Sequence, residues 1–254
     1  MIINKMKKLT VLFAFLCPFF AFAQDQEGVI RYLITQHYSK KLAAVDYISK
    51  QTKERNEYIW GSRSEWKVYA NLYFNAAESK YEDSEEKAEK DEGNYSWKKD
   101  AFFIKRDFAK RTSYDVMTVV GQVYIVEDTI RYPEWKILNE MKEVAGHVCM
   151  NATYTDTLSK ELVVGWFALD LPLNGGPERF GGLPGLILEV DINNGAVIIS
   201  ADKIDLKKLD QQLALPKKKI KGKKVNEDGY REMLKKHYAE KRKAEQPPYW
   251  GLRY

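Results

Sequence analysis

Short runs that alternate apolar and polar residues, separated by turns, dominate the sequence up to about residue 204. The run KVYANLYFN places every second residue from Val68 to Phe74 on one face of an extended strand, because successive strand side chains point to opposite faces. The turn Asn193-Asn194-Gly195 between two apolar runs predicts a hairpin. About nine or more such runs favour a mainly β fold, with one large antiparallel sheet that is either curved or closed into a partly open barrel.

The chain changes character after residue 204. The segment KIDLKKLDQQL predicts a short helix, and residues 217–224 form a basic linker. Asn226 is a good N-cap for a C-terminal helix over 227–245, which Pro247 and Pro248 would end. We expect this helix to pack on the sheet, since its apolar stripe is narrow for membrane binding and its polar face carries both signs of charge. The stripe consists of Tyr230, Met233, Leu234 and His237.

Two segments before residue 100 carry weaker signals. The residues EYIW at 57–60 are rich in aromatic and β-branched side chains, which is typical of a strand. Residues 78–92 are mostly charged and include no large aliphatic side chain, so we expect a solvated loop or a frayed helix. An acidic cation-binding loop is disfavoured there, because the regular ligand spacing and central glycine of a calcium loop are missing.

The first 23 residues predict a secretory signal peptide. A lysine-bearing start precedes the apolar run VLFAFLCPFFAFA, which ends in Ala21-Phe22-Ala23, so we expect cleavage before Gln24. Lipidation at Cys17 is disfavoured, since it would need cleavage inside the apolar run. The remaining residues, 24–254, are expected to form a single domain with the linker and helix at 204–254. The protein is then exported, periplasmic or associated with the cell envelope, with no transmembrane segment after signal removal.

Removal of the signal peptide changes what the charge implies. Loss of Lys5, Lys7 and Lys8 lowers the basic residues from 41 to 38 against 36 acidic ones, so the net charge falls from +5 to +2. This balance argues against a nucleic-acid partner. Cys149 is then the one remaining cysteine, which excludes an internal disulfide.

The stretch Gly165–Val190 joins two apolar runs through a segment rich in glycine and proline. Glycine allows close backbone approach and proline removes a donor, so the segment predicts a shaped, irregular connection rather than a tight hairpin. A phosphate-binding loop is excluded, because no Lys-Ser/Thr pair follows and Pro184 occupies a position where an amide donor is needed. The glycines are Gly175, Gly176, Gly181, Gly182 and Gly185.

The same stretch carries a recognisable motif. Gly176-Pro177, Phe180 and then the run GLPGLIL at 182–188 resemble the GLPGLI family, exported proteins of unknown function from Gram-negative bacteria. Other pieces agree in order, including LYFNAAESKY, VYIVEDTIRYPEWKI and KEVAGHVCMNA. The resemblance implies no established catalytic residues, cofactor or substrate. Envelope lipid and lipoprotein carriers, whose curved antiparallel sheet wraps helices, offer a fold analogy only.

Candidate chemistry within the connection is limited. Arg179 could bind a carboxylate or phosphate of a ligand, or it could form an ion pair that fixes the loop, which is the interpretation we favour. Paired carboxylates such as Asp170 and Glu178 could serve acid–base hydrolysis. We take as candidate ligand-binding residues Asp170, Glu178, Arg179, Phe180, Leu183 and Pro184.

Cys149 and the histidines offer a second possibility. His147 and Cys149 share one face of a strand, but the sequence supplies no third group to orient a nucleophile–base pair. A cysteine between Val148 and Met150 is more typical of a buried small apolar residue. The pair also supplies two metal ligands where a structural zinc site needs four, so we predict no metal and no cofactor.

These observations favour a binding protein over an enzyme. The aromatic content suits a sheet that holds an apolar or lipid-like ligand, or a surface that contacts an envelope protein partner. The alternative is an envelope hydrolase with a site near the 170–185 loop.

Overall fold

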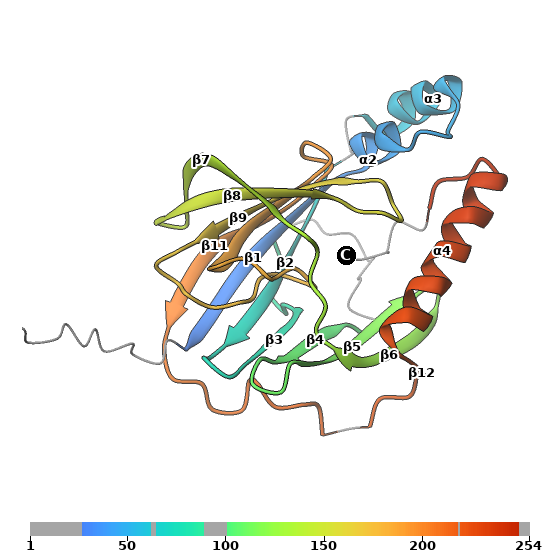
Figure 1. Ribbon diagram of the computed structural model, residues 1–254. Coiled ribbons are helices and arrows are strands. Elements are labelled where there is room, and N and C mark those ends of the chain that lie inside the picture. The colour runs from blue at the N-terminus through green and yellow to red at the C-terminus, as the bar shows by residue number, and fades with distance from the viewer. Residues whose placement is uncertain (1–26, 62–64, 89–100, 218, 249–254) are drawn as a thin grey trace, which may run out of the picture.

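The computed structural model describes residues 27–61, 65–88, 101–217 and 219–248, which form one twelve-stranded sheet and three helices (Figure 1). The strands are β1 (Gly28–His37), β2 (Glu65–Phe74), β3 (Glu78–Asp83), β4 (Phe103–Asp107), β5 (Thr112–Val119), β6 (Gln122–Thr129), β7 (Lys136–Val144), β8 (His147–Thr155), β9 (Leu162–Ala168), β10 (Leu186–Ile192), β11 (Val197–Leu206) and β12 (Lys223–Val225). The helices are α2 (Tyr38–Ala44), α3 (Lys50–Trp60) and α4 (Glu227–Lys243).

The sheet runs in the order β12-β6-β5-β4-β3-β2-β1-β11-β10-β9-β8-β7. Neighbouring strands are antiparallel except for β12, which pairs parallel with β6. The sheet is strongly curved and, over the described residues, does not close into a barrel (Figure 1). The predicted mainly β fold with a large curved antiparallel sheet and a C-terminal helix is confirmed.

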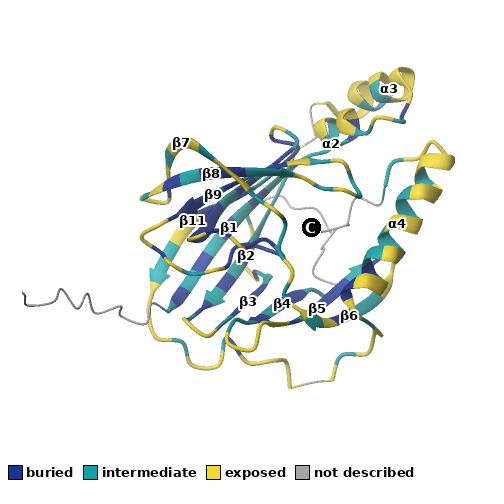
Figure 2. Ribbon diagram, viewed as in Figure 1, coloured by how far each residue is buried: buried dark blue, intermediate teal, exposed yellow. Residues whose placement is uncertain are grey.

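Alternating burial along the central strands defines the core (Figure 2). In β1, Ile30, Tyr32 and Ile34 are buried while the residues between them are partly exposed. Leu72 and Phe74 of β2 are buried on the same pattern, as the alternation in the sequence predicts. The predicted hairpin also forms, since β10 and β11 pair directly on either side of the 193–195 turn.

Helix α4 begins and packs as expected. The Asn226 side chain accepts a hydrogen bond from the Gly229 amide at 3.0 Å, which satisfies one of the free amides of the first turn. Tyr230 is buried, and Met233 and Leu234 pack beside it against Val126 of β6. The helix ends at Lys243, slightly before the predicted 245.

Three local predictions are wrong. Residues 78–83 form β3 rather than a solvated loop, because both backbone edges pair with neighbouring strands and Tyr81 supplies a buried ring. Residues 57–60 end α3 rather than forming a strand, since Ser49 caps the helix and helix-forming residues fill its middle. The segment 203–213 begins as the end of β11, where Ile204 pairs with Ile30, and has no helix. Residues 89–92 of the charged run lie outside the described residues.

No helix in the described part of the chain combines the length and apolar character needed to cross a bilayer. The signal peptide predicted at 1–23 lies outside the described residues.

Candidate functional site

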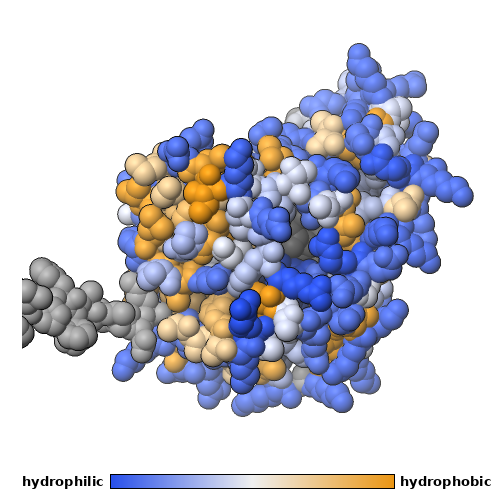
Figure 3. All heavy atoms as spheres, viewed as in Figure 1, coloured by the Kyte–Doolittle hydropathy of each residue, from blue (hydrophilic) through white to orange (hydrophobic). Residues whose placement is uncertain are grey.

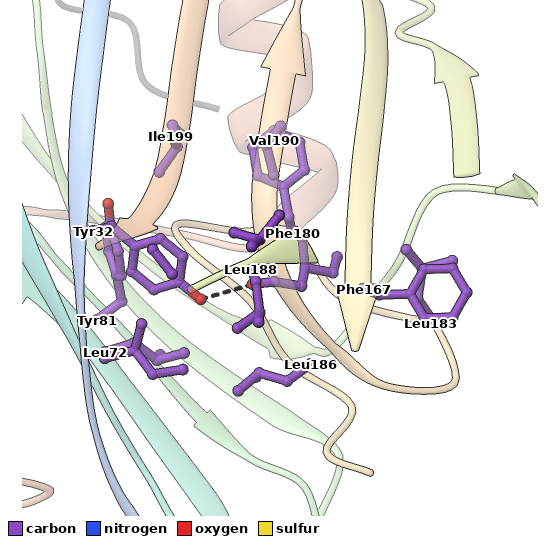
Figure 4. Packing of buried hydrophobic residues seen from close by; sticks show 14 of the residues in the cluster. Tyr32, Leu72, Tyr81, Phe167, Phe180, Leu183, Leu186, Leu188, Val190 and Ile199 are labelled. Atoms are coloured by element: carbon purple, nitrogen blue, oxygen red, sulfur yellow. Dashed lines mark hydrogen bonds between the residues drawn. The ribbon is translucent and has the colours of Figure 1, made fainter. Parts of the chain in front are cut away.

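The connection between β9 and β10, residues 169–185, is irregular and folds back onto the sheet. The Leu186 amide donates to the Leu171 carbonyl at 2.9 Å, and the Ile187 amide donates to the Gly175 carbonyl at 3.0 Å. Phe180 and Leu183 join the same buried cluster as Tyr32 and Leu72 (Figure 4). The Tyr32 hydroxyl donates to the Ile187 carbonyl at 2.7 Å. The connection therefore fills the inner side of the curved sheet with its own side chains.

Aromatic residues from the β6–β7 segment hold the connection in place. The Trp135 indole donates to the Gly181 carbonyl at 2.8 Å, and the Tyr132 hydroxyl donates to the Asn174 carbonyl at 3.1 Å. A Cβ atom at Gly181 would lie 2.5 Å from the Tyr132 ring, and one at Gly182 would lie 2.6 Å from the Tyr132 Cβ. Glycine at these positions is what lets Tyr132 approach the backbone this closely.

Arg179 anchors the connection in a buried ionic network. Its Nε donates to Asp115 Oδ2 at 3.0 Å, and its Nη2 donates to Glu227 at the start of α4. Asp115 is fully buried and also accepts from Arg106 of β4. Burial opposes the charge of Arg179, but the carboxylates of Asp115 and Glu227 outweigh burial and raise the pKa of the guanidinium. The network thus contains two cations, Arg106 and Arg179, and two anions, Asp115 and Glu227. It links the connection to the sheet and to α4.

A cleft of about 320 Å³ opens beside this network. Residues of helix α4, of the β8–β9 hairpin and of the β6–β7 segment form most of its lining. Arg179 and Phe180 bring the connection into its lining. The volume falls at the lower end of the range for small-molecule pockets. Its aromatic lining consists of Tyr132, Tyr154, Phe180, Tyr230 and Tyr238.

Tyr230, one of the lining residues, carries an unpaired polar atom. The residue is 1% exposed, and its hydroxyl is buried without a hydrogen-bond partner among the described residues. Such a group costs about 1–3 kcal/mol when it is left unsatisfied. Burial raises the pKa of Tyr230, and the nearby guanidinium of Arg179 only partly offsets that effect. Tyr230 is therefore neutral, and its hydroxyl is a buried donor next to the cleft.

The six residues predicted from the sequence do not converge on one site. Arg179 and Phe180 line the cleft. Leu183 is buried in the core, while Pro184 and Asp170 are exposed. Glu178 is buried, with φ at 50°, in the left-handed region that favours glycine.

The surroundings of Glu178 include a half-buried cation from α2. Burial lowers the pKa of Lys41 to about 8, and the carboxylates of Glu161 and Glu178 oppose that shift. Lys41 also donates to the Gln36 side chain at 3.0 Å. Glu178 thus faces the base of α2 and takes no part in lining the cleft.

Asp170 supplies the orienting group that the sequence did not reveal for His147. The His147 Nδ1 and Asp170 Oδ2 atoms lie 2.7 Å apart. Cys149, however, points its thiol at the His147 carbonyl, at 3.5 Å, rather than at the imidazole. Burial, followed by the negative charge of Asp170, raises the pKa of Cys149 to about 11. A catalytic cysteine needs a lowered pKa, so this arrangement does not activate the thiol.

Cys149 is accordingly expected to resist alkylation in the folded protein. A pKa about two units above the ordinary value reduces the thiolate fraction roughly 100-fold, and full burial blocks access further. Iodoacetamide labelling followed by mass spectrometry, with and without urea, measures this. Equal labelling rates in both conditions would contradict the buried thiol.

Among the described residues, no group of three or more His, Cys, Asp or Glu side chains is placed to hold a metal ion. Apolar side chains gather on the surface over β7, β8 and β9, on the left of the view in Figure 3. They include the exposed residues Ile137, Met141, Val148 and Leu169. This surface is open rather than enclosed, so the cleft is the stronger candidate site.

Sequence reasoning found one side of the cleft and missed the other. The motif pointed to Arg179 and Phe180, and the helix stripe pointed to Tyr230. Asp115 carried no signal, because a single aspartate in an alternating strand reads as a solvent-facing residue. Tyr154 and Asp156 belong to a hairpin whose proximity to α4 depends on the curvature of the whole sheet.

Comparisons with known proteins give a family segment and a fold. A family model described as "Protein of unknown function (Porph_ging)" matches residues 157–189, which contain β9 and the glycine-rich connection. No curated protein matches the sequence. Structures of PNGF-II in the C2 and P21 space groups are similar, each with 15% identity and a TM-score of 0.53 over 82% of this chain. The chain spans about a third of the length of PNGF-II, 32% and 33% in the two structures. At this identity the likeness shows the fold alone.

Proposed function

We propose that this chain is an exported cell-envelope binding protein of the GLPGLI type, and that it holds an apolar ligand in the cleft between α4 and the β8–β9 hairpin. The signal-peptide pattern at residues 1–23 supports export. The GLPGLIL run at 182–188 supports the family assignment, because it lies within the segment that the family model matches.

The observation that carries the proposal is the unpaired hydroxyl of Tyr230 in an aromatic cleft. Five aromatic rings line about 320 Å³, which suits a flat or chain-like apolar group. The buried hydroxyl without a partner favours a ligand that brings a hydrogen-bond acceptor to that point. Ligand specificity in such pockets commonly rests on a few placed polar groups of this kind.

The inner side of the sheet is a weaker candidate for a lipid-like ligand. Leu171, Phe180 and Leu183 of the connection are at most 5% exposed and pack against the strands that a ligand would need to contact. A cleft of about 320 Å³ admits one ring system or one chain segment rather than a whole two-chain lipid. The ligand, or the part of an envelope partner that binds here, is therefore small and apolar.

Positively charged side chains beside the cleft indicate a further property of the ligand. Arg131 pairs with Asp228, and Arg231 donates to the Thr157 hydroxyl at 3.2 Å, so both guanidinium groups stand beside the cleft. An acidic or carbonyl-bearing end on the ligand would meet the Tyr230 hydroxyl and these cations together.

The fluorescent probe 8-anilinonaphthalene-1-sulfonate combines apolar rings with an anionic group and tests the cleft directly. We expect saturable binding by the folded protein. Leu234→Trp, from the α4 wall, or Leu158→Trp, from the hairpin wall, should weaken it at least about tenfold by filling the space. The matched control is Leu215→Trp, because Leu215 is 48% exposed and lies outside the cleft.

Two outcomes would overturn the proposal. One is unchanged probe affinity in both filled variants while circular dichroism shows an intact fold. The other is a loss of probe affinity in Leu215→Trp as large as that in the two filled variants. Hydrolysis of ester, amide or glycoside substrates by the purified protein, abolished by Asp170→Asn, would instead support the hydrolase alternative near residues 170–185.

A further inference from the structure

The part of the cleft lining that comes from α4 forms a stripe directed toward the end of that helix. Tyr230, Leu234 and Tyr238 line the cleft at intervals of four residues, so they lie on one face of the helix. Arg242 continues this face and pairs with Asp46 at 3.0 Å, in the turn between α2 and α3. The stripe therefore leads from the end of α4 into the cleft.

The chain turns sharply where α4 ends. The Gln246 amide donates to the Lys241 carbonyl at 3.0 Å, and the Glu245 amide donates to the Arg242 carbonyl at 3.2 Å. Glu245 has φ at 51°, in the left-handed region, so these bonds form a Schellman motif. Figure 1 shows the chain beyond α4 turning back toward the sheet.

After this turn the chain approaches the body of the protein again. Residues 242–246 are exposed, whereas Pro247 and Pro248 are partly buried. The residues that follow, Tyr249-Trp250-Gly251-Leu252-Arg253-Tyr254, lie outside the described residues, and we refer to them as the C-terminal segment. Four of these six carry an aromatic ring or a leucine side chain, which are groups that gain free energy when they leave water.

The C-terminal segment is long enough to reach the cleft. Along the axis of α4, Tyr238, Leu234 and Tyr230 lie about 8, 14 and 20 Å before the last residue of the helix. Six extended residues span about 20 Å. A segment that runs from Pro248 back along α4 therefore passes all three cleft residues. The other apolar surface, over β7, β8 and β9, lies on the opposite side of the view from α4 (Figure 1 and Figure 3).

A peptide suits the polar groups along this path. The hydroxyls of Tyr47 and Tyr230 are both buried without a hydrogen-bond partner among the described residues. The Tyr47 ring lies beside the end of α4, with its centre 4.7 Å from the Arg242 guanidinium, and Tyr230 lies in the cleft lining. Carbonyl groups recur along a peptide backbone and accept hydrogen bonds, so one length of chain can supply an acceptor to each hydroxyl.

We propose that the C-terminal segment occupies the cleft when no ligand is bound, and that a ligand binds by displacing it. The displacement rests on the proposed function, because it takes the cleft as the ligand site, whereas the placement of the segment does not. Occupation by the chain itself lowers the apparent affinity for a ligand in proportion to the fraction of molecules in which the cleft is open. The segment thus sets a threshold that a ligand must exceed.

Hydrogen exchange followed by mass spectrometry tests the placement without any ligand. The amides of the C-terminal segment should exchange at least about tenfold faster in Leu234→Trp, which fills the cleft, than in the unmodified chain. Leu158→Trp, from the hairpin, is a second filled variant and should act in the same way. The matched control is Leu215→Trp, outside the cleft lining, in which exchange should match that of the unmodified chain. Circular dichroism shows whether each variant is folded.

Binding of 8-anilinonaphthalene-1-sulfonate tests the displacement. Trp250→Ser with Leu252→Ser should bind the probe at least about tenfold more tightly than the unmodified chain, because the altered segment competes less well. The matched control is Tyr58→Ser with Ile59→Ser, which removes a similar pair of side chains from α3, where they are 93% and 53% exposed. Its probe affinity should equal that of the unmodified chain.

Two results would overturn the inference. One is equally fast exchange of the segment in the unmodified chain and in both filled variants. The other is equal probe affinity in the Trp250→Ser, Leu252→Ser variant and in its control. Both results leave the proposed function standing, provided that the probe binds. If no chain binds the probe while both filled variants still speed the exchange of the segment, the proposed function fails and the placement of the segment is supported.

Discussion

Replacing Asp115 with alanine is expected to lower the free energy of unfolding by about 3–5 kcal/mol, the range for breaking a buried ion pair. Asp115 is fully buried and accepts from both Arg106 and Arg179. Without its carboxylate, Arg106 loses its acidic partner and Arg179 keeps Glu227 alone. Urea denaturation followed by circular dichroism measures the loss.

The matched control is Asp107→Asn on the same pair of strands. Asp107 pairs with Lys110 at an exposed turn, where solvent screens the interaction, so the denaturation midpoint should stay where it is. If Asp115→Ala and Asp107→Asn lowered the free energy of unfolding by similar amounts, the buried network would not be what holds the connection to the sheet.

A second large effect is expected from Gly185→Ala. A Cβ atom at Gly185 would lie 2.2 Å from the Ala168 carbonyl oxygen and 2.8 Å from its carbonyl carbon. Because both contacts are with backbone, the connection or β9 must move, and overpacking of this kind costs about 1–3 kcal/mol or more. Thermal unfolding of the variant should show a clear drop in melting temperature.

Gly61→Ala is the control for this substitution. A Cβ there meets only the Glu57 side chain, at 3.5 Å, and φ is −49°. Alanine at such a position should be neutral or slightly stabilising, by about 0.4–1 kcal/mol. An unchanged melting temperature for Gly185→Ala would contradict the close packing of the connection on β9.

Much of the sheet could be predicted because its signals are local. The alternation from Val68 to Phe74, the 193–195 turn and the Asn226 cap each depend on a few adjacent residues, and all three recur in the structure. β3 escaped prediction because its order comes from pairing with β2 and β4 rather than from its own composition. Charged side chains on its open face are compatible with a paired backbone.

The α2–α3 insertion was missed for a related reason. A short aromatic and β-branched run such as EYIW fits a strand and the end of a helix equally well. The deciding features are the Ser49 cap upstream and the direct pairing of His37 with Glu65. The second of these is visible only once β1 and β2 are aligned.

The candidate site was likewise predictable only where its signals are local. The motif identified the connection, and the favoured interpretation of Arg179 as an ion-pairing residue agrees with its observed partners. Those partners, Asp115 and Glu227, lie 64 and 48 residues away in the chain. No spacing rule links positions so far apart, because only the curvature of the sheet brings them together.

The geometry therefore favours a structural role for the glycine-rich connection. It fills the inside of the curved sheet, fixes α4 through Arg179 and provides part of the cleft floor through Phe180. In this account its glycines serve close packing, and ligand contact falls to a cleft that the connection helps to build.

Native mass spectrometry of the protein recovered gently from the envelope of its own cells tests this account most directly. The account predicts a chain that begins at Gln24 and carries a small apolar species, and it predicts that Leu234→Trp, recovered in the same way, lacks that species. A folded protein with no bound species, or a species retained equally by Leu234→Trp and Leu158→Trp, would contradict it.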